Sequence, residues 1–172
     1  MKLAKTIALA TTFAATALMA APSMAQTPKP IKQHNAWGAY SYNDAQAGKI
    51  CYILSIPTEK LPTDRDHGDV FFLVSQKPDG SGRFEPQVEV GYPLQANADV
   101  MVNVDGKEFK MFSQGNNAWL ADVNQEPDLV AAMRAGRSMK VSGKSSRGTS
   151  TNYTYSLSGV TAALGDVANC KK

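Results

Sequence analysis

The sequence predicts an all-β protein, an antiparallel β-sandwich with one or two short helices. Short segments with alternating apolar and polar residues recur along the chain, and clusters of Gly, Pro, Asn and Asp separate them. Only two stretches have helical periodicity, so the strand–helix–strand repeat of a parallel sheet is missing. We expect the strands to form a single domain over residues 36–172.

The N-terminus, residues 1–25, has the pattern of a secretory signal peptide. Two lysines form a positive start, an uncharged apolar run follows, and Ser23 and Ala25 supply the small residues of a cleavage site. The apolar run is too short for a membrane-spanning helix, and no second long apolar stretch follows. We therefore expect export to the periplasm, with outer-membrane or surface association left open. The mature chain is expected to be soluble and to begin with a flexible leader over residues 26–35.

The first expected strands follow this leader. Aromatic residues mark a short strand over residues 37–42. In residues 49–56 every second side chain is Ile, Tyr or Leu, which indicates one apolar face. Residues 69–76 (DVFFLVSQ) are apolar on both faces, which is typical of a central strand. Polar connections that contain proline flank this central strand.

The second half of the chain contains the remaining strands and both helices. Further short strands are expected at residues 88–92 and 100–104, around Phe109 and Met111, and at 119–120. Asp105 and Gly106 predict a two-residue hairpin turn. A helix is expected over residues 127–135, with Pro127 in its first turn and Gly136 at its end. A second short helix is expected over residues 160–167.

The segment SGKSSRGTS (residues 142–150) has the composition of a phosphate-binding loop. A Walker loop needs an earlier Gly and a following helix, but Ser138 stands at the first position and the β-rich residues 152–157 come next. We interpret the segment as the turn of a hairpin whose buried face holds Met, Val, Tyr and Leu. The outer side then presents a candidate binding edge made of Lys140, Lys144 and Arg147, although solvated surface charge is the commoner explanation for such residues.

Two cysteines, Cys51 and Cys170, remain in a chain that we expect to be exported. Each is the other's most plausible partner in an oxidising compartment, so we predict a disulfide that ties an early strand to the C-terminus. Two free thiols or a bond to another molecule are the alternatives. Alkylation without reductant, followed by intact-mass measurement, separates these cases.

The chain contains no linear motif for catalysis or metal binding. His67 stands near Asp64, Asp66 and Asp69, but Gly68 occupies a ligand position of the calcium-loop pattern and no distal Glu follows. We interpret this segment as a solvated turn. Zinc would need more His or Cys, and no Gly-x-Ser-x-Gly is present. We expect no enzyme, cofactor or metal, although a triad assembled in space around His67 stays open.

Several segments resemble the bacterial invasion-associated locus B family. They are KICYILSIP, GDVFFLVSQKP, GYPL, VNVDGKEFKMF, AWLAD, LVAAMRAGRSMKVSGKSSRGTSTNYTYSLSGVTAAL and a final ANC. The likeness runs from about residue 37 to residue 170, and its most specific part is residues 132–164. The resemblance implies export by a Gram-negative bacterium, a β-rich fold and a link to host-cell invasion and virulence. It supplies no catalytic residues. Many members have further cysteines where this chain has Tyr40-Ser41 and Phe112-Ser113, so here only the long-range pair is expected.

The sequence therefore predicts a non-enzymatic envelope or periplasmic protein that acts by binding an envelope or host-surface component. The formal net charge is +3, of which the two signal-peptide lysines contribute two, so the +1 that remains does not indicate nucleic acid. An envelope hydrolase without a linear motif and a periplasmic folding helper are the alternatives. A carboxylate pair in a pocket would favour the hydrolase, and an exposed apolar groove would favour the helper.

Overall fold

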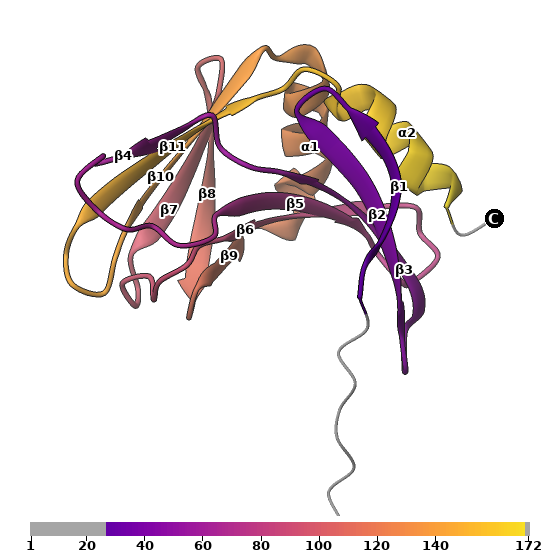
Figure 1. Cartoon of the computed structure of the whole chain (residues 1–172), viewed down its shortest axis with the longest axis horizontal. Helices are drawn as coiled ribbons and strands as arrows, with labels where there is room; N and C mark the ends of the chain where they lie inside the picture. Colours follow the sequence, from indigo (N-terminus) through magenta and orange to yellow (C-terminus); the bar gives the residue numbers. More distant parts are fainter. Residues whose placement is uncertain (1–26, 171–172) are drawn as a thin grey trace, which may run out of the picture.

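The computed structural model describes residues 27–170, and the signal peptide expected over residues 1–25 lies outside this range. The described strands form one continuous antiparallel sheet in the order β1-β2-β3-β5-β6-β9-β8-β7-β10-β11-β4 (Figure 1). Their bounds are β1 Lys29–His34, β2 Trp37–Asp44, β3 Gly48–Ser55, β4 Glu59–Leu61, β5 Phe71–Gln76, β6 Phe84–Glu89, β7 Asp99–Val104, β8 Lys107–Gln114, β9 Asn117–Leu120, β10 Ser138–Lys144 and β11 Ser150–Ser156.

The sheet is folded over, so that strands distant in its order meet in the core. Trp37 of β2 packs edge-on against Phe72 of β5, and Phe72 packs in the same way against Tyr155 of β11. The Trp37 indole Nε1 donates a hydrogen bond to the Ser156 carbonyl at 2.9 Å. The predicted all-β antiparallel class with short helices is confirmed, and one folded sheet supplies both layers of the sandwich.

Strand β1 corrects the expectation of a flexible leader over residues 26–35. Residues 29–34 pair with β2, and the His34 imidazole Nε2 lies 2.7 Å from a carboxylate oxygen of Asp166. The strand lies at the edge of the sheet and its side chains are mostly exposed, so its composition is polar. An edge strand also accommodates Pro30, because a missing amide donor costs little there. The short edge strand β4 was missed for the same reason.

Both predicted helices are present, and the β10–β11 hairpin buries the predicted Met, Val, Tyr and Leu side chains. Helix α1 (Glu126–Ala135) packs against β6 and against helix α2 (Val160–Asn169), and α2 packs against β1, β2 and β3 (Figure 1). The buried face of α2 consists of Val160, Ala163, Leu164 and Val167. A short 3-10 helix, η1 (Val123–Gln125), leads into α1. Neither α1 nor α2, within the described part of the chain, is long and apolar enough to cross a membrane.

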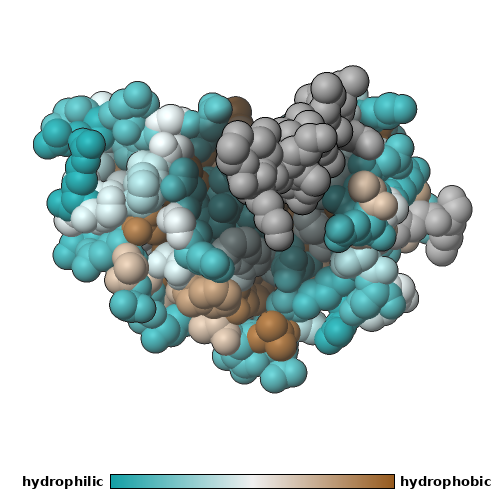
Figure 2. Space-filling view, turned by 90° about the horizontal axis from the view of Figure 1, so that it is seen from below, coloured by the Kyte–Doolittle hydropathy of each residue, from teal (hydrophilic) through white to brown (hydrophobic). Residues whose placement is uncertain are grey.

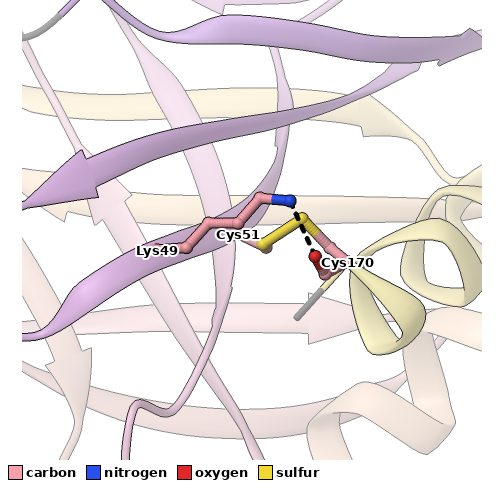
Figure 3. Close-up of a disulfide and its surroundings, with 3 residues drawn as sticks. All are labelled: Lys49, Cys51 and Cys170. Atoms are coloured by element: carbon pink, nitrogen blue, oxygen red, sulfur yellow. Dashed lines mark hydrogen bonds between the residues drawn. A yellow bond between two sulfur atoms is a disulfide. The ribbon is translucent and has the colours of Figure 1, made fainter. Parts of the chain in front are cut away.

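The expected disulfide between Cys51 and Cys170 is present. It joins a fully buried position of β3 to the residue that follows α2, with 6.3 Å between the Cα atoms (Figure 3). The Lys49 ammonium donates a hydrogen bond to the Cys170 carbonyl at 2.8 Å beside this bond. The end of α2 is therefore fixed to the inner face of the sheet by covalent and polar contacts.

Hydrophilic residues cover most of the surface seen from below, and apolar residues gather in a limited area near its lower margin (Figure 2). The exposed large hydrophobic residues of the described chain come from separate elements: Ile31, Ile56, Leu61, Phe112 and Val123. Of these, Phe112 on β8 packs against Trp119 on β9, with 5.9 Å between the ring centroids.

Candidate functional site

A polar cleft of about 380 Å³ lies where three loops converge. The loops are residues 62–70 between β4 and β5, residues 90–98 between β6 and β7, and the turn of the β10–β11 hairpin. The residues that line the cleft are Arg65, Asp66, His67, Gly91, Tyr92, Pro93, Ser145, Ser146, Arg147, Thr149 and Thr151. The cleft thus brings together the aspartate-rich segment and the hairpin turn that the sequence singled out.

Backbone hydrogen bonds hold the hairpin turn against the second loop. The Ser146 amide donates to the Pro93 carbonyl and the Gln95 amide donates to the Lys144 carbonyl, both at 2.8 Å. An isolated β-bridge joins Leu94 to Ser145 between these bonds. The hairpin turn is therefore attached to the body of the protein, and its side chains have a fixed place beside the cleft.

The first and second loops meet through a glycine. A Cβ atom on Gly91 would lie 2.5 Å from the His67 carbonyl oxygen and 2.7 Å from the Gly68 Cα. Both distances are shorter than van der Waals contact, so a larger residue cannot be accommodated without moving backbone. Gly91 thereby sets the distance between the two loops that form one wall of the cleft.

His67 is buried, whereas the sequence predicted a solvated turn. Asp64, Asp66 and Asp69 are exposed as expected, but His67 is only 6% exposed. Its Nε2 lies 2.9 Å from the Pro62 carbonyl oxygen, which can only accept, so Nε2 carries the hydrogen. The surrounding backbone uses this imidazole as an internal polar anchor, and among the described residues no group of His, Cys, Asp and Glu is placed to hold a metal ion.

A chain of hydroxyl groups continues from His67 along the floor of the cleft. The Tyr153 oxygen lies 2.9 Å from the His67 Nδ1 and 2.6 Å from the Tyr92 oxygen, which is 2.7 Å from the Thr151 oxygen. The Tyr92 hydroxyl donates to the Thr151 oxygen, and the Thr151 hydroxyl donates to the Gly143 carbonyl at 3.3 Å. Burial, and next the hydrogen bond that the phenol donates to Tyr92, raise the pKa of Tyr153 above its ordinary value, so this phenol stays neutral.

The rim of the cleft carries two guanidinium groups. Arg65 and Arg147 are both exposed, and they come from the first loop and from the hairpin turn. Arg65 has only a long contact of 3.8 Å with the exposed Asp64, and Arg147 has no ion pair with any residue between 27 and 170. Asp66, the single carboxylate of the lining, accepts a hydrogen bond from the Gly68 amide. The cleft therefore has an excess of positive charge.

The structure divides the predicted binding edge. Arg147 lines the cleft, whereas Lys140 and Lys144 are exposed on β10 and are not part of the lining. Sequence reasoning missed Arg65 and Tyr92 as partners of Arg147. The motif GYPL contains Tyr92, but nothing in its pattern indicates that it meets a hairpin more than fifty residues away.

The hairpin turn does not form a phosphate cradle. The amides of three of its residues are already used: those of Ser145 and Gly148 donate to the Thr149 and Ser145 carbonyls, and that of Ser146 donates to Pro93. The Thr149 amide donates to the Ser145 hydroxyl. A strand follows the turn instead of a helix. We therefore expect recognition at this cleft to come mainly from side chains.

Comparisons with known proteins agree with the fold. The model of the family described as Invasion associated locus B (IalB) protein matches residues 37–168. Among solved structures, the crystal structure of invasion associated protein B from Bartonella henselae is similar, with a TM-score of 0.59 and 18% sequence identity. The match covers 81% of this chain and 96% of that chain, and at this identity it shows the fold alone. A comparison with curated proteins finds no match.

Proposed function

Because the chain belongs to the invasion associated locus B (IalB) family, we propose that it is an exported bacterial protein that acts by binding. The partner is a component of the envelope or of a host-cell surface, and the binding surface is the cleft between residues 62–70, residues 90–98 and the β10–β11 turn. An exported disulfide-bonded fold and the family's association with invasion support this assignment.

One observation carries the proposal: the cleft collects two guanidinium groups that have few partners within the described part of the protein, beside several hydroxyl groups. A charged side chain that serves only the fold is usually paired or solvated in isolation. Here Arg65 and Arg147 converge on one concave surface from segments that lie far apart in the sequence. Convergent polar groups in a concave surface are typical of a binding site.

The chemistry of the cleft favours binding over catalysis. Both ring nitrogens of His67 are engaged with Tyr153 and Pro62, so this imidazole is not free to take a proton from a substrate. Asp66 is the one carboxylate in the lining, whereas a glycoside hydrolase needs two facing carboxyl groups. These features support a protein that holds its partner without transforming it.

A pull-down with matched charge variants tests the proposal. The protein is immobilised and exposed to envelope extract and to host-surface extract, beside an Arg65→Ser/Arg147→Ser variant and a Lys140→Ser/Lys144→Ser variant. Both variants remove two positive charges from exposed positions, but only the first changes the lining of the cleft. We expect the first variant to lose the retained component and the second to keep it. Equal retention by all three proteins, at equal thermal stability, would refute the assignment.

A further inference from the structure

The rim and the floor of the cleft offer different chemistry. Arg65 and Arg147 at the exposed rim are donors of fixed positive charge, and a guanidinium pairs well with the two oxygens of a carboxylate or phosphate. The floor of the cleft is formed by the neutral hydroxyl groups of Tyr92 and Thr151. Thr151 is almost fully buried, and Tyr92 is half-buried. The cleft is therefore suited to a ligand that has an anionic group at one side and uncharged polar groups at the other.

The order of the hydroxyl chain defines what the floor recognises. The Tyr92 hydroxyl donates its hydrogen to the Thr151 oxygen, so the Tyr92 oxygen can only accept a hydrogen bond from a ligand. The Thr151 hydroxyl lies 2.7 Å from that oxygen and 3.3 Å from the Gly143 carbonyl, so it has an acceptor of its own within the protein. The Tyr92 oxygen then receives a donor from the ligand. A ligand hydroxyl group meets this requirement, and a bare oxyanion does not.

The size of the cleft limits the ligand to a compact unit. A volume of about 380 Å³ falls at the lower end of the range observed for small-molecule sites, roughly 300–1,000 Å³. Such a site has room for more than an isolated phosphate ion. The hydroxyls of Ser145, Ser146 and Thr149 in the lining add further hydrogen-bonding groups for a polyhydroxylated ligand.

From these observations we infer that the cleft binds an acidic sugar unit, in which a phosphate or carboxylate group contacts Arg65 and Arg147 and a sugar hydroxyl donates to Tyr92. This inference rests on the proposed function, because it takes the same cleft as the binding surface. It adds the chemical class of the ligand, and it applies equally to a free sugar and to the terminal unit of a longer glycan.

Titration of the disulfide-bonded protein with four probes tests the inference. Isothermal titration calorimetry with glucose 6-phosphate, glucuronate, glucose and inorganic phosphate separates the contributions of charge and hydroxyl groups. We expect glucose and phosphate to bind at least about tenfold more weakly than the better acidic sugar, since each lacks one set of contacts. The Arg65→Ser/Arg147→Ser variant should bind that acidic sugar more than about tenfold more weakly than the wild-type protein. For the Lys140→Ser/Lys144→Ser variant the loss of affinity should be less than about twofold.

A Tyr92→Phe variant isolates the role of the floor. Loss of one neutral hydrogen bond should lower the affinity for the acidic sugar by about fivefold and leave the affinity for phosphate unchanged. Inorganic phosphate that binds as tightly as glucose 6-phosphate would overturn the inference, because the cleft would then recognise only an oxyanion. If no probe binds while the pull-down still depends on Arg65 and Arg147, the ligand class is wrong and the proposed function stands. A pull-down that is insensitive to these arginines refutes the proposed function itself.

Discussion

Removal of the disulfide tests how the C-terminal helix is held. The bond closes a loop of 119 residues, and in the chain-entropy model a loop of this length stabilises the folded state by about 5 kcal/mol. Cys51 is fully buried in β3, so alanine is a better replacement than serine. We expect a Cys51→Ala/Cys170→Ala variant to lose roughly 3–5 kcal/mol of unfolding free energy, which corresponds to a melting temperature roughly 10–20 °C lower.

Urea unfolding followed by circular dichroism measures this loss. The wild-type protein with its disulfide reduced is the matched control, because it loses the bond without losing any atoms from the core. Helix α2 also buries Val160, Ala163, Leu164 and Val167 against the sheet, so its far-ultraviolet signal should persist at 25 °C in both proteins. A loss below about 1 kcal/mol in both proteins would contradict the reasoning, since the denatured chain would then gain little freedom when the bond is opened.

Three further predictions concern single side chains. Burial raises the pKa of Tyr155, so the stabilisation from this neutral phenol is complete below pH 10. Above pH 10 the free energy of unfolding should fall by up to about 1.4 kcal/mol per pH unit. Tyr155→Phe should reduce this slope in unfolding curves measured at alkaline pH. Lys77 lies 2.8 Å from the buried carboxylate of Glu126, so Lys77→Met should cost about 3–5 kcal/mol in urea unfolding, and an added Glu126→Gln should recover much of it. Gly91→Ala forces the His67 backbone away, which should cost about 1–3 kcal/mol in thermal unfolding and weaken binding of the acidic sugar probe; unchanged binding would show that the two loops are not held by this contact.

The strands that the sequence predicted best are those with a buried face. Alternation in residues 138–144 reflects one side that faces the core, where Met139 and Val141 are buried. Residues 49–56 also contain the predicted strand, but the fully buried core side chains are Cys51 and Ile53, on the face opposite to the predicted apolar one, and Ile56 is exposed. The edge strands β1 and β4 have almost no buried side chains, and their backbone pairing leaves no periodic trace in the sequence. Pairing of a polar edge strand depends on what its neighbour offers, and a local pattern cannot contain that information.

The candidate site was predictable in its parts but not in its assembly. Arg147 was identified from the hairpin, and the segment around His67 was noticed for its carboxylates, yet nothing local indicated that they share a cleft. Their convergence depends on backbone hydrogen bonds from the hairpin turn to the second loop and on the close contact at Gly91. Long-range contacts of this kind are set by the folded sheet.

The hairpin turn shows why composition alone gives an ambiguous answer about function. Gly, Ser and Thr are favoured in a phosphate-binding loop because their small size leaves backbone amides accessible, and they are favoured in a turn because they satisfy those same amides locally. Here the amides of Ser145, Ser146 and Gly148 are satisfied within the protein, so the turn itself has no donors left for a ligand from these positions. What it provides is a rigid position for Arg147, opposite Arg65 of another loop. Affinity for an anion at this cleft should therefore depend mainly on the two guanidinium groups and fall by more than about tenfold when both are removed, even though the turn remains folded.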